Sequence, residues 1–161
     1  RFRSQAPALR RQGFAPEPVA QCFALVREAA GRVLGQRHYD SQLIAGWWLL
    51  GGRLAEMATG EGKTLAVLLT AATAAMAGIP VHVLTANDYL AERDALRLAP
   101  LYRSLGLSVA CVLGHSTPDE RRAAYGRDIT YATANEIGST SCAIAWRSVS
   151  TNTCTAASSP L

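Results

Sequence analysis

The hydrophobic pattern of this chain changes its period several times, and the order of the changes predicts helices followed by alternating strands and helices. Between Pro18 and Leu34 the apolar residues recur every three or four positions, which predicts an amphipathic helix. Residues 42–50 are mostly apolar and predict a second helix, with Trp47 or Trp48 packed into the core. Both helices lie ahead of the segments that predict a sheet.

The later segments alternate between strand-like and helix-like patterns. We expect strands at 53–57, 81–85, 108–113 and 128–133, and helices at 63–77, 88–105 and 118–125. The helix at 118–125 is short, and the helix at 88–105 should stop or kink near Pro100. Apolar strands separated by helices form parallel sheets with both faces covered, so the pattern predicts an α/β fold. A ligand of such a sheet binds at the carboxyl ends of the strands.

Length and composition narrow the class of protein. The 161 residues suffice for about one domain. Four scattered cysteines fit a reducing, cytoplasmic compartment, and no apolar run approaches the ~20 residues that cross a bilayer. The net charge of +4 is uneven, because residues 1–37 hold seven arginines against Glu17 and Glu28. This basic region suits anionic lipid or an acidic protein surface, and a solvated helix face is the plainer alternative.

A single lysine is present beside 15 arginines, and it lies in a glycine-rich turn. A compact, flexible ammonium is suited to contact the β- and γ-phosphates of a nucleotide. The two glycines let backbone N–H groups turn toward an anion, and the helix that follows adds its positive dipole end. The threonine after the lysine offers a hydroxyl ligand for a phosphate-bridging Mg²⁺. The motif consists of Thr59, Gly60, Glu61, Gly62, Lys63 and Thr64.

This motif departs from the strict phosphate-loop pattern G-x-x-x-x-G-K-[ST] at Met57, where the pattern has glycine. The predicted strand before it and the predicted helix after it supply the context that a phosphate loop requires. A glycine-rich connection with a chance lysine is the alternative. We predict that Lys63 and Thr64 serve as the catalytic pair of a site for ATP and Mg²⁺, with Thr64 as the metal ligand.

A second element precedes the loop. The carboxamide of Gln42 has a donor and an acceptor side by side, which match N6–H and N7 of adenine, and Tyr39 could stack on the base. Arg37 is a further candidate contact of the nucleotide. On their own, a glutamine, an arginine or His38 in such a stretch are more often solvated surface residues.

Four segments together resemble the family of SecA preprotein translocase ATPases. They are Arg37-His-Tyr-Asp-Ser-Gln-Leu-Ile44, Ala55-Glu-Met-Ala-Thr-Gly-Glu-Gly-Lys-Thr-Leu65, Val81-His-Val-Leu-Thr-Ala-Asn-Asp-Tyr-Leu-Ala-Glu-Arg-Asp-Ala95 and Asp128-Ile-Thr-Tyr-Ala-Thr-Ala-Asn-Glu136. The family carries the methionine found here at Met57. The resemblance runs from about residue 19 to residue 138.

The resemblance implies a partial RecA-like P-loop NTPase domain of the superfamily 2 helicase type, which binds ATP and Mg²⁺. It implies a motor that drives unfolded preproteins through the SecYEG channel, contacts anionic lipid, lies on the cytoplasmic side of the inner membrane and forms homodimers in its full-length members. Arg93 would then contact the nucleotide or couple it to the translocating polypeptide. Asn87 and Asp88 are equally suited to cap a helix, and residues 133–136 to form a strand-to-helix turn.

No apolar strand after Lys63 ends in the Asp-Glu pair of a Walker B element, which supports Mg²⁺ and polarises the attacking water. In the family this element lies further downstream, and so does the second motor domain. We therefore expect ATP binding that is weaker than in a whole motor, and negligible hydrolysis.

The pattern of the family breaks after Gly138. Ten of the last 23 residues are Ser or Thr, and neither a period of two nor one of 3.6 is sustained. We expect a single-base frame slip with an early stop, and divide the chain into a basic arm at 1–17, a partial first nucleotide-binding domain at 18–138 and an aberrant, disordered tail at 139–161. A superfamily 2 nucleic-acid helicase domain and a non-functional product are the alternatives, although we expect no nucleic-acid partner, because aromatic and basic residues do not interleave.

Overall fold

The computed structural model describes residues 6–139, and the first five residues and the tail from 140 onward lie outside that range. Seven helices and three strands are present in the described range. In chain order they are α1 (Ala6–Gln12), α2 (Pro16–Val33), α3 (Asp40–Leu50), α4 (Lys63–Met76), β1 (Val81–Thr85), α5 (Asp88–Ser104), β2 (Val109–Cys111), α6 (Pro118–Tyr125), β3 (Ile129–Thr133) and α7 (Ala134–Ser139). The predictions made for the tail therefore remain predictions.

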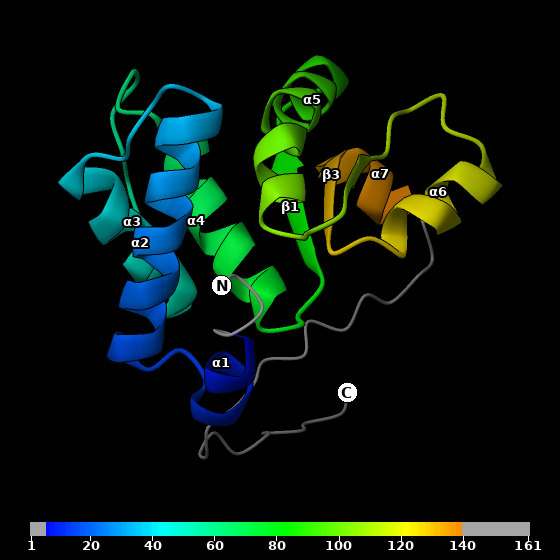
Figure 1. Cartoon of the computed structure of the whole chain (residues 1–161). Coiled ribbons are helices and arrows are strands. Elements are labelled where there is room, and N and C mark those ends of the chain that lie inside the picture. Colours follow the sequence, from blue (N-terminus) through cyan, green and yellow to red (C-terminus); the bar gives the residue numbers. More distant parts are fainter. Residues whose placement is uncertain (1–5, 140–161) are drawn as a thin grey trace, which may run out of the picture.

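The three strands form one parallel sheet in the order β1-β3-β2 (Figure 1). The central strand β3 is buried at all five positions, as expected for a strand covered on both faces. Ile129 pairs with Val81 on one side and with Val109 on the other. The predicted class, an α/β fold with a parallel sheet flanked by helices, is confirmed.

Successive residues of β3 point to opposite faces of the sheet, and different helices cover the two faces. Ile129 and Tyr131 belong to the main core, together with Leu98 and Leu101 of α5. Ala132 belongs to a smaller cluster with Ala124 of α6 and Val112. The sheet is thus sandwiched between α5 and α6.

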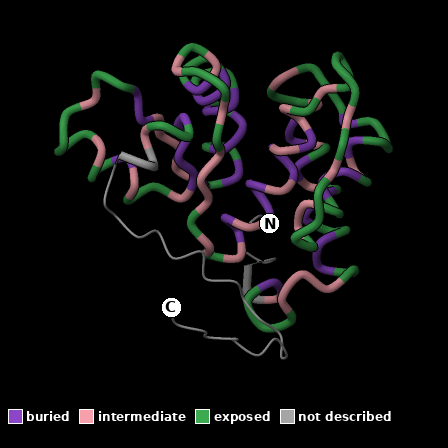
Figure 2. The backbone as a smooth tube through the Cα atoms, turned by 180° about the vertical axis from the view of Figure 1, so that it is seen from behind, coloured by how far each residue is buried: buried purple, intermediate pink, exposed green. Residues whose placement is uncertain are grey.

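Helices α2, α3 and α4 form a group beside β1 (Figure 1). The predicted amphipathic helix is confirmed, since α2 buries Val19, Cys22 and Val26 along one side. Leu9 of α1 joins the same core with 2 % exposure, so part of the region expected as a basic arm is packed against the domain. The buried stretches gather where these helices face one another, and the connecting loops are largely exposed (Figure 2).

The prediction that Trp47 or Trp48 packs into the core is wrong. Their exposed fractions are 38 % and 43 %, and α3 buries Gln42, Ala45 and Gly46 instead. A Cβ atom at Gly46 would lie 3.2 Å from Leu69 Cβ, so α3 approaches α4 through its smallest residue. Close helix contact needs small side chains, and the tryptophans are left on the outer side.

The predicted strand at 53–57 is also absent. These residues have no regular secondary structure, and the side chain of Leu54 is 96 % exposed. An extended segment becomes a strand only when its backbone N–H and C=O groups pair with a neighbouring strand, and none of β1, β2 and β3 pairs with this segment. Two smaller differences are that α5 runs through Pro100 to Ser104, and that the strand expected at 108–113 is shortened to Val109–Cys111.

Two buried tyrosines connect α5 with the central strand. The hydroxyl groups of Tyr102 and Tyr131 are 3.0 Å apart, and their exposed fractions are 0 % and 1 %. Burial is the main cause that raises the pKa of Tyr131 to about 12, with a contribution from Asp94, so the pair is neutral. Each hydroxyl satisfies the other beneath the sheet.

We expect Tyr102→Phe to lower the free energy of unfolding by about 1–3 kcal/mol, because Tyr131 then keeps a buried hydroxyl without its partner. Tyr102→Phe combined with Tyr131→Phe should cost less than the sum of the two single changes. Urea denaturation of the 161-residue chain measures all three variants. Tyr125→Phe is the matched control, since the buried Tyr125 hydroxyl has no hydrogen-bond partner among the described residues. Strict additivity of the two changes would contradict the pairing.

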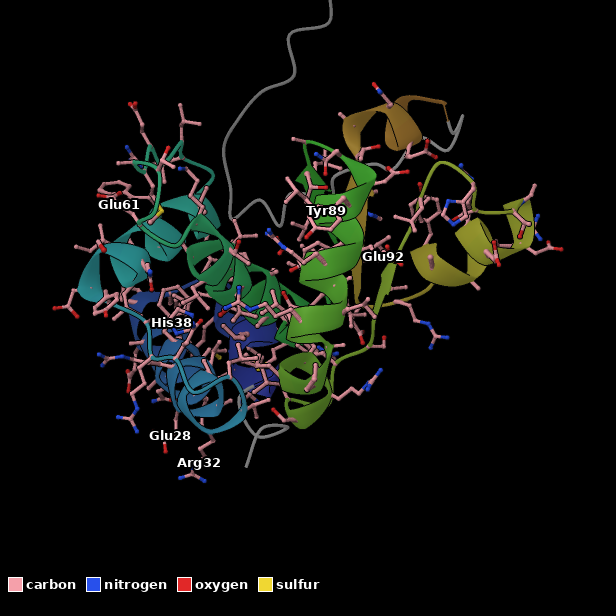
Figure 3. The ribbon with its side chains drawn as sticks, turned by 90° about the horizontal axis from the view of Figure 1, so that it is seen from above. Glu28, Arg32, His38, Glu61, Tyr89 and Glu92 are labelled. Carbon is pink, nitrogen blue, oxygen red and sulfur yellow. The ribbon has the colours of Figure 1, made fainter. Side chains whose placement is uncertain are left out.

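His38 connects the turn before α3 to α4. Its side chain is buried between these elements (Figure 3), and Nε2 lies 3.0 Å from the carbonyl oxygen of Leu65. The carbonyl of His38 itself accepts a hydrogen bond of 3.0 Å from Arg27 Nε. Burial is the main cause that lowers the pKa of His38 below 6.5. The folded state therefore holds the neutral imidazole, with Nε2 as the donor to Leu65.

This burial makes stability depend on pH. Below about pH 6.5 the unfolded chain takes up a proton on His38 while the folded chain does not, so stability that is complete above this pH is lost as the pH falls. We expect the free energy of unfolding to fall between about pH 7 and pH 5, and His38→Gln to reduce that fall. Denaturant titrations across this range measure it. The pH profile of His82→Gln is measured for comparison, because burial also lowers the pKa of His82. Identical pH profiles for the parent and His38→Gln would contradict the assignment.

Candidate nucleotide-binding site

The glycine-rich loop lies between α3 and α4, and two of its residues adopt backbone conformations that suit glycine. Gly60 has φ +91° and Gly62 has φ +81°. Side chains are rarely tolerated in this region because Cβ collides with the neighbouring backbone. At Gly62, which is the N-cap of α4, an added Cβ would also collide with Gln42 Nε2. An added Cβ at Gly60 would meet nothing within 4 Å, so the space beside this glycine is open.

The loop is closed by hydrogen bonds among its own residues. Lys63 Nζ donates to the carbonyl of Ala58 at 3.0 Å, and the N–H of Ala58 donates to the Glu61 carboxylate at 2.8 Å. Glu61 lies on the exposed side of this turn (Figure 3). The ammonium is thus held at a neutral carbonyl rather than at a carboxylate, and it can exchange this partner for a phosphate oxygen.

The start of α4 provides free donors beside that ammonium. The N–H groups of Leu65 and Ala66 bond to the carbonyl of Gly62, while those of Lys63 and Thr64 have no acceptor among residues 6–139. Free N–H groups and the positive end of a helix dipole together favour an anion. The donor set, with one ammonium, two free N–H groups and the Thr64 hydroxyl, therefore fits a magnesium-bound phosphate group.

Gln42 is joined to this loop from α3. Its Nε2 donates to the carbonyl of Glu61 at 2.7 Å, and its Oε1 accepts the N–H of Tyr39 at 3.1 Å. The residue is 3 % exposed. Both ends of the carboxamide thus hold backbone groups, and this contact brings the two elements identified in the sequence together.

Arg37 and Tyr39 lie further from the loop contacts. Arg37 Nη2 forms an ion pair of 2.8 Å with Glu28 of α2, and Tyr39 is 74 % exposed. Glu28 also pairs with Arg32, and the labelled Glu28 and Arg32 lie on the far side of α2 from Glu61 (Figure 3). Neither Arg37 nor Tyr39 has a side-chain hydrogen bond to the loop in the described range. Their roles in nucleotide binding remain predictions.

A pocket of about 280 Å³ opens between the start of α4, the end of β1 and α5. Lys63, Thr64 and Arg93 line it, so three of the predicted site residues share one cavity. Arg93 donates through Nε and Nη2 to Asp94 Oδ1 at 2.9 and 2.7 Å. Thr64 Oγ1 lies 3.5 Å from the other oxygen, Asp94 Oδ2, at the long end of hydrogen bonding.

Asp94 was not predicted as a site residue. The sequence nevertheless contains a signal, because Asp94 is a charged residue on the buried stripe of α5 that includes Ala91, Ala95, Leu98 and Leu101. A buried charge needs a partner, and this one has two.

The segments near residues 87–88 and 133–136, which were also identified in the sequence, meet at the loop before α6. The Asn87 side chain accepts the N–H of Leu90 at 2.9 Å, which confirms the N-cap interpretation. Asp88 accepts the N–H of Gly114 at 2.7 Å, while Arg121 of α6, which donates to the carbonyl of Ser116 in this loop at 2.9 Å, forms an ion pair with Glu136. The segments near 88 and 136 therefore hold the same loop, at the carboxyl edge of the sheet.

A larger pocket of about 630 Å³ lies between α3 and residues 53–61. Ile44, Trp48 and Leu54 contribute to its wall, and the cation of Arg53 lies 4.9 Å from the centre of the Trp48 ring. This pocket contains neither Lys63 nor Thr64, so the smaller cavity is the candidate phosphate site.

Comparison with known proteins identifies the family. A family model described as the SecA DEAD-like domain matches residues 2–140. The chain is 54 % identical over 123 residues to protein translocase subunit SecA 2 of Bordetella avium, 57 % over 118 residues to SecA of Stutzerimonas stutzeri and 55 % over 122 residues to SecA of Thermus thermophilus.

These alignments cover 76 %, 73 % and 76 % of this chain but only 19 %, 13 % and 12 % of the respective relatives. The chain thus spans less than a fifth of their length. Among residues 6–139, no helix combines the length and the hydropathy that crossing a bilayer requires. With the family model matching most of its length and relatives above half identity, the chain belongs to the SecA family, in the part that forms the SecA DEAD-like domain.

Proposed function

We propose that this chain binds ATP with Mg²⁺ at the start of α4, as part of the first nucleotide-binding domain of a SecA-type protein-translocation motor. The observation that carries the proposal is the convergence of the Lys63 ammonium, the free N–H groups of Lys63 and Thr64, and the open space at Gly60. Together they supply positive charge and directed donors without a side chain in the way.

Each residue has a distinct role in this proposal. Lys63 leaves the carbonyl of Ala58 and contacts the terminal phosphates, and the loop N–H groups bind the oxygens between them. Thr64 Oγ1 ligates Mg²⁺, and Arg93 adds positive charge at the far wall of the same pocket. Gln42 holds the loop and contacts the adenine through the second Nε2–H and the second Oε1 lone pair that these backbone groups leave unused, with Tyr39 stacked on the base and Arg37 beside it. Phosphoryl transfer from bound ATP to water supplies the free energy that drives the motor.

The proposed partners follow from the family. Relatives above half identity are named protein translocase subunits. We propose that the whole protein moves unfolded preproteins through the SecYEG channel, lies in the cytoplasm and on the inner membrane, and self-associates as a homodimer. The basic residues Arg10 and Arg11 in the last turn of α1 support contact with anionic lipid, although Arg10 also donates to the carbonyl of Ala77 at 3.3 Å.

Lys63→Ala should weaken ATP binding about 10- to 100-fold, because a hydrogen bond to a charged group contributes about 1.5–3 kcal/mol. Isothermal titration calorimetry with ATP and Mg²⁺ on the 161-residue chain measures the change. Arg103→Ala, which removes an equal charge at the end of α5, is the control and should bind like the parent. Equal affinities for Lys63→Ala and the parent, or no binding by the parent, would refute the proposed site.

Gln42→Ala should weaken both ATP and GTP, because the Glu61 carbonyl loses its donor and the loop loses support. The loss should be larger for ATP, since the donor and acceptor for adenine are removed as well. Competition binding with the two nucleotides separates these roles. If Gln42→Ala loses equal affinity for ATP and GTP, Gln42 supports the loop but does not recognise adenine. Unchanged affinities for both nucleotides would contradict both roles. Ser41→Ala, at an exposed position next to Gln42, is the control.

A further inference from the structure

Asp94 is a buried carboxylate that connects α5 to the start of α4. The residue is 7 % exposed and lies on the apolar stripe of its helix. Its two oxygens serve different partners, because Oδ1 accepts both hydrogen bonds from Arg93, while Oδ2 faces Thr64 Oγ1 at 3.5 Å. Both Thr64 and Asp94 line the pocket assigned to the phosphates.

The direction of the contact with Thr64 determines what the hydroxyl can do next. A threonine hydroxyl has one proton and two lone pairs, and a carboxylate can only accept. When the proton of Thr64 points to Asp94, its lone pairs are left for another partner. A cation in the pocket would meet an oxygen that is already oriented and made more basic by the carboxylate behind it, as is usual for the outer partners of metal ligands.

We propose that Asp94 is a positioning residue for Mg²⁺, which orients the Thr64 hydroxyl from behind while its other oxygen holds Arg93 at the same pocket. The inference rests on the proposed function and deepens it, because it assigns the outer partner of the metal ligand. It also connects two segments far apart in the sequence, since Thr64 is the second residue of α4 and Asp94 lies in the second turn of α5.

A purely structural ion pair with Arg93 is the competing interpretation. Such a pair needs only one carboxylate oxygen, and Arg93 already bonds twice to Oδ1. The side chain of Arg93 is 44 % exposed and could hold a carboxylate outside the core. Burying Asp94 beside Thr64 costs desolvation free energy that an ion pair at the surface would avoid. An ion pair alone therefore does not explain this position, whereas the contact of Oδ2 with Thr64 does.

The test compares the affinity of the 161-residue chain for ATP with Mg²⁺ and with EDTA by isothermal titration calorimetry. In Asp94→Asn the gain in affinity that Mg²⁺ gives should fall about 10-fold or more, and this loss should exceed any change in EDTA that comes from releasing Arg93. Glu92→Gln is the matched control, because Glu92 is an exposed carboxylate on the same helix and lies on the side of α5 turned away from α4 (Figure 3). It should retain the full gain.

A double-mutant comparison separates positioning from stability. In a Thr64→Ala background, Asp94→Asn should have no further effect on the gain from Mg²⁺, because the hydroxyl that Asp94 orients is gone. Thermal unfolding identifies variants that lose the fold. If Asp94→Asn unfolds, Asp94→Glu keeps the charge but moves the carboxylate by one methylene, and it should still lower the gain.

The outcomes are distinguishable. Losses that are equal with Mg²⁺ and EDTA, additive effects in the Thr64→Ala background, or an undiminished gain in Asp94→Glu when Asp94→Asn unfolds, would each overturn the positioning role while leaving ATP binding intact. If the parent binds no ATP, the proposed function fails and this inference fails with it.

Discussion

The close contact at Gly62 is the constraint on which the arrangement of the loop depends. This residue ends the loop, caps α4 with a left-handed conformation and lies against the carboxamide of Gln42 from α3. Because Gln42 also donates to the carbonyl of Glu61, α3 holds the loop from behind while its other side stays open. Any side chain at Gly62 would both strain the backbone and displace Gln42. The phosphate binding proposed for Lys63 therefore depends on α3, although Lys63 itself lies on α4.

The second organising feature is a line of polar groups that runs from the pocket into the core where α4, α5 and the sheet meet. Thr64, Asp94 and Arg93 form its outer part at the pocket, and the hydroxyl pair of Tyr102 and Tyr131 forms its inner part. Apolar residues at these positions would pack with less desolvation cost, so the polar groups are not needed for stability alone. Because their hydrogen bonds form only when α4, α5 and the sheet are correctly placed, we infer that the polar line makes this placement specific. The proposed roles of Thr64 and Asp94 use one end of this line.

Particular elements show how far sequence patterns extend. The strands β1 and β3, the helices α2, α4 and α6 and the parallel sheet follow from periodicity and from glycine and proline breaks, because these signals are local. The predicted strand at 53–57 failed because a strand requires a partner that its own residues do not reveal. The prediction for the two tryptophans of α3 failed because the period of a helix shows only which residues share a face. It does not show which face packs, and here α3 makes its closest contact through the small residue Gly46.

The sequence by itself determined the family, the glycine-rich loop and its lysine, since each depends on residue types at short, fixed spacings. Only the tertiary structure decided that Gln42 supports the loop, that Arg37 pairs with Glu28 on α2, and that Asp94 lies behind Thr64. Those contacts join residues 9 to 30 positions apart. Side chains so far apart in sequence meet only after the helices have packed, because packing, rather than spacing along the chain, brings their atoms within hydrogen-bonding distance.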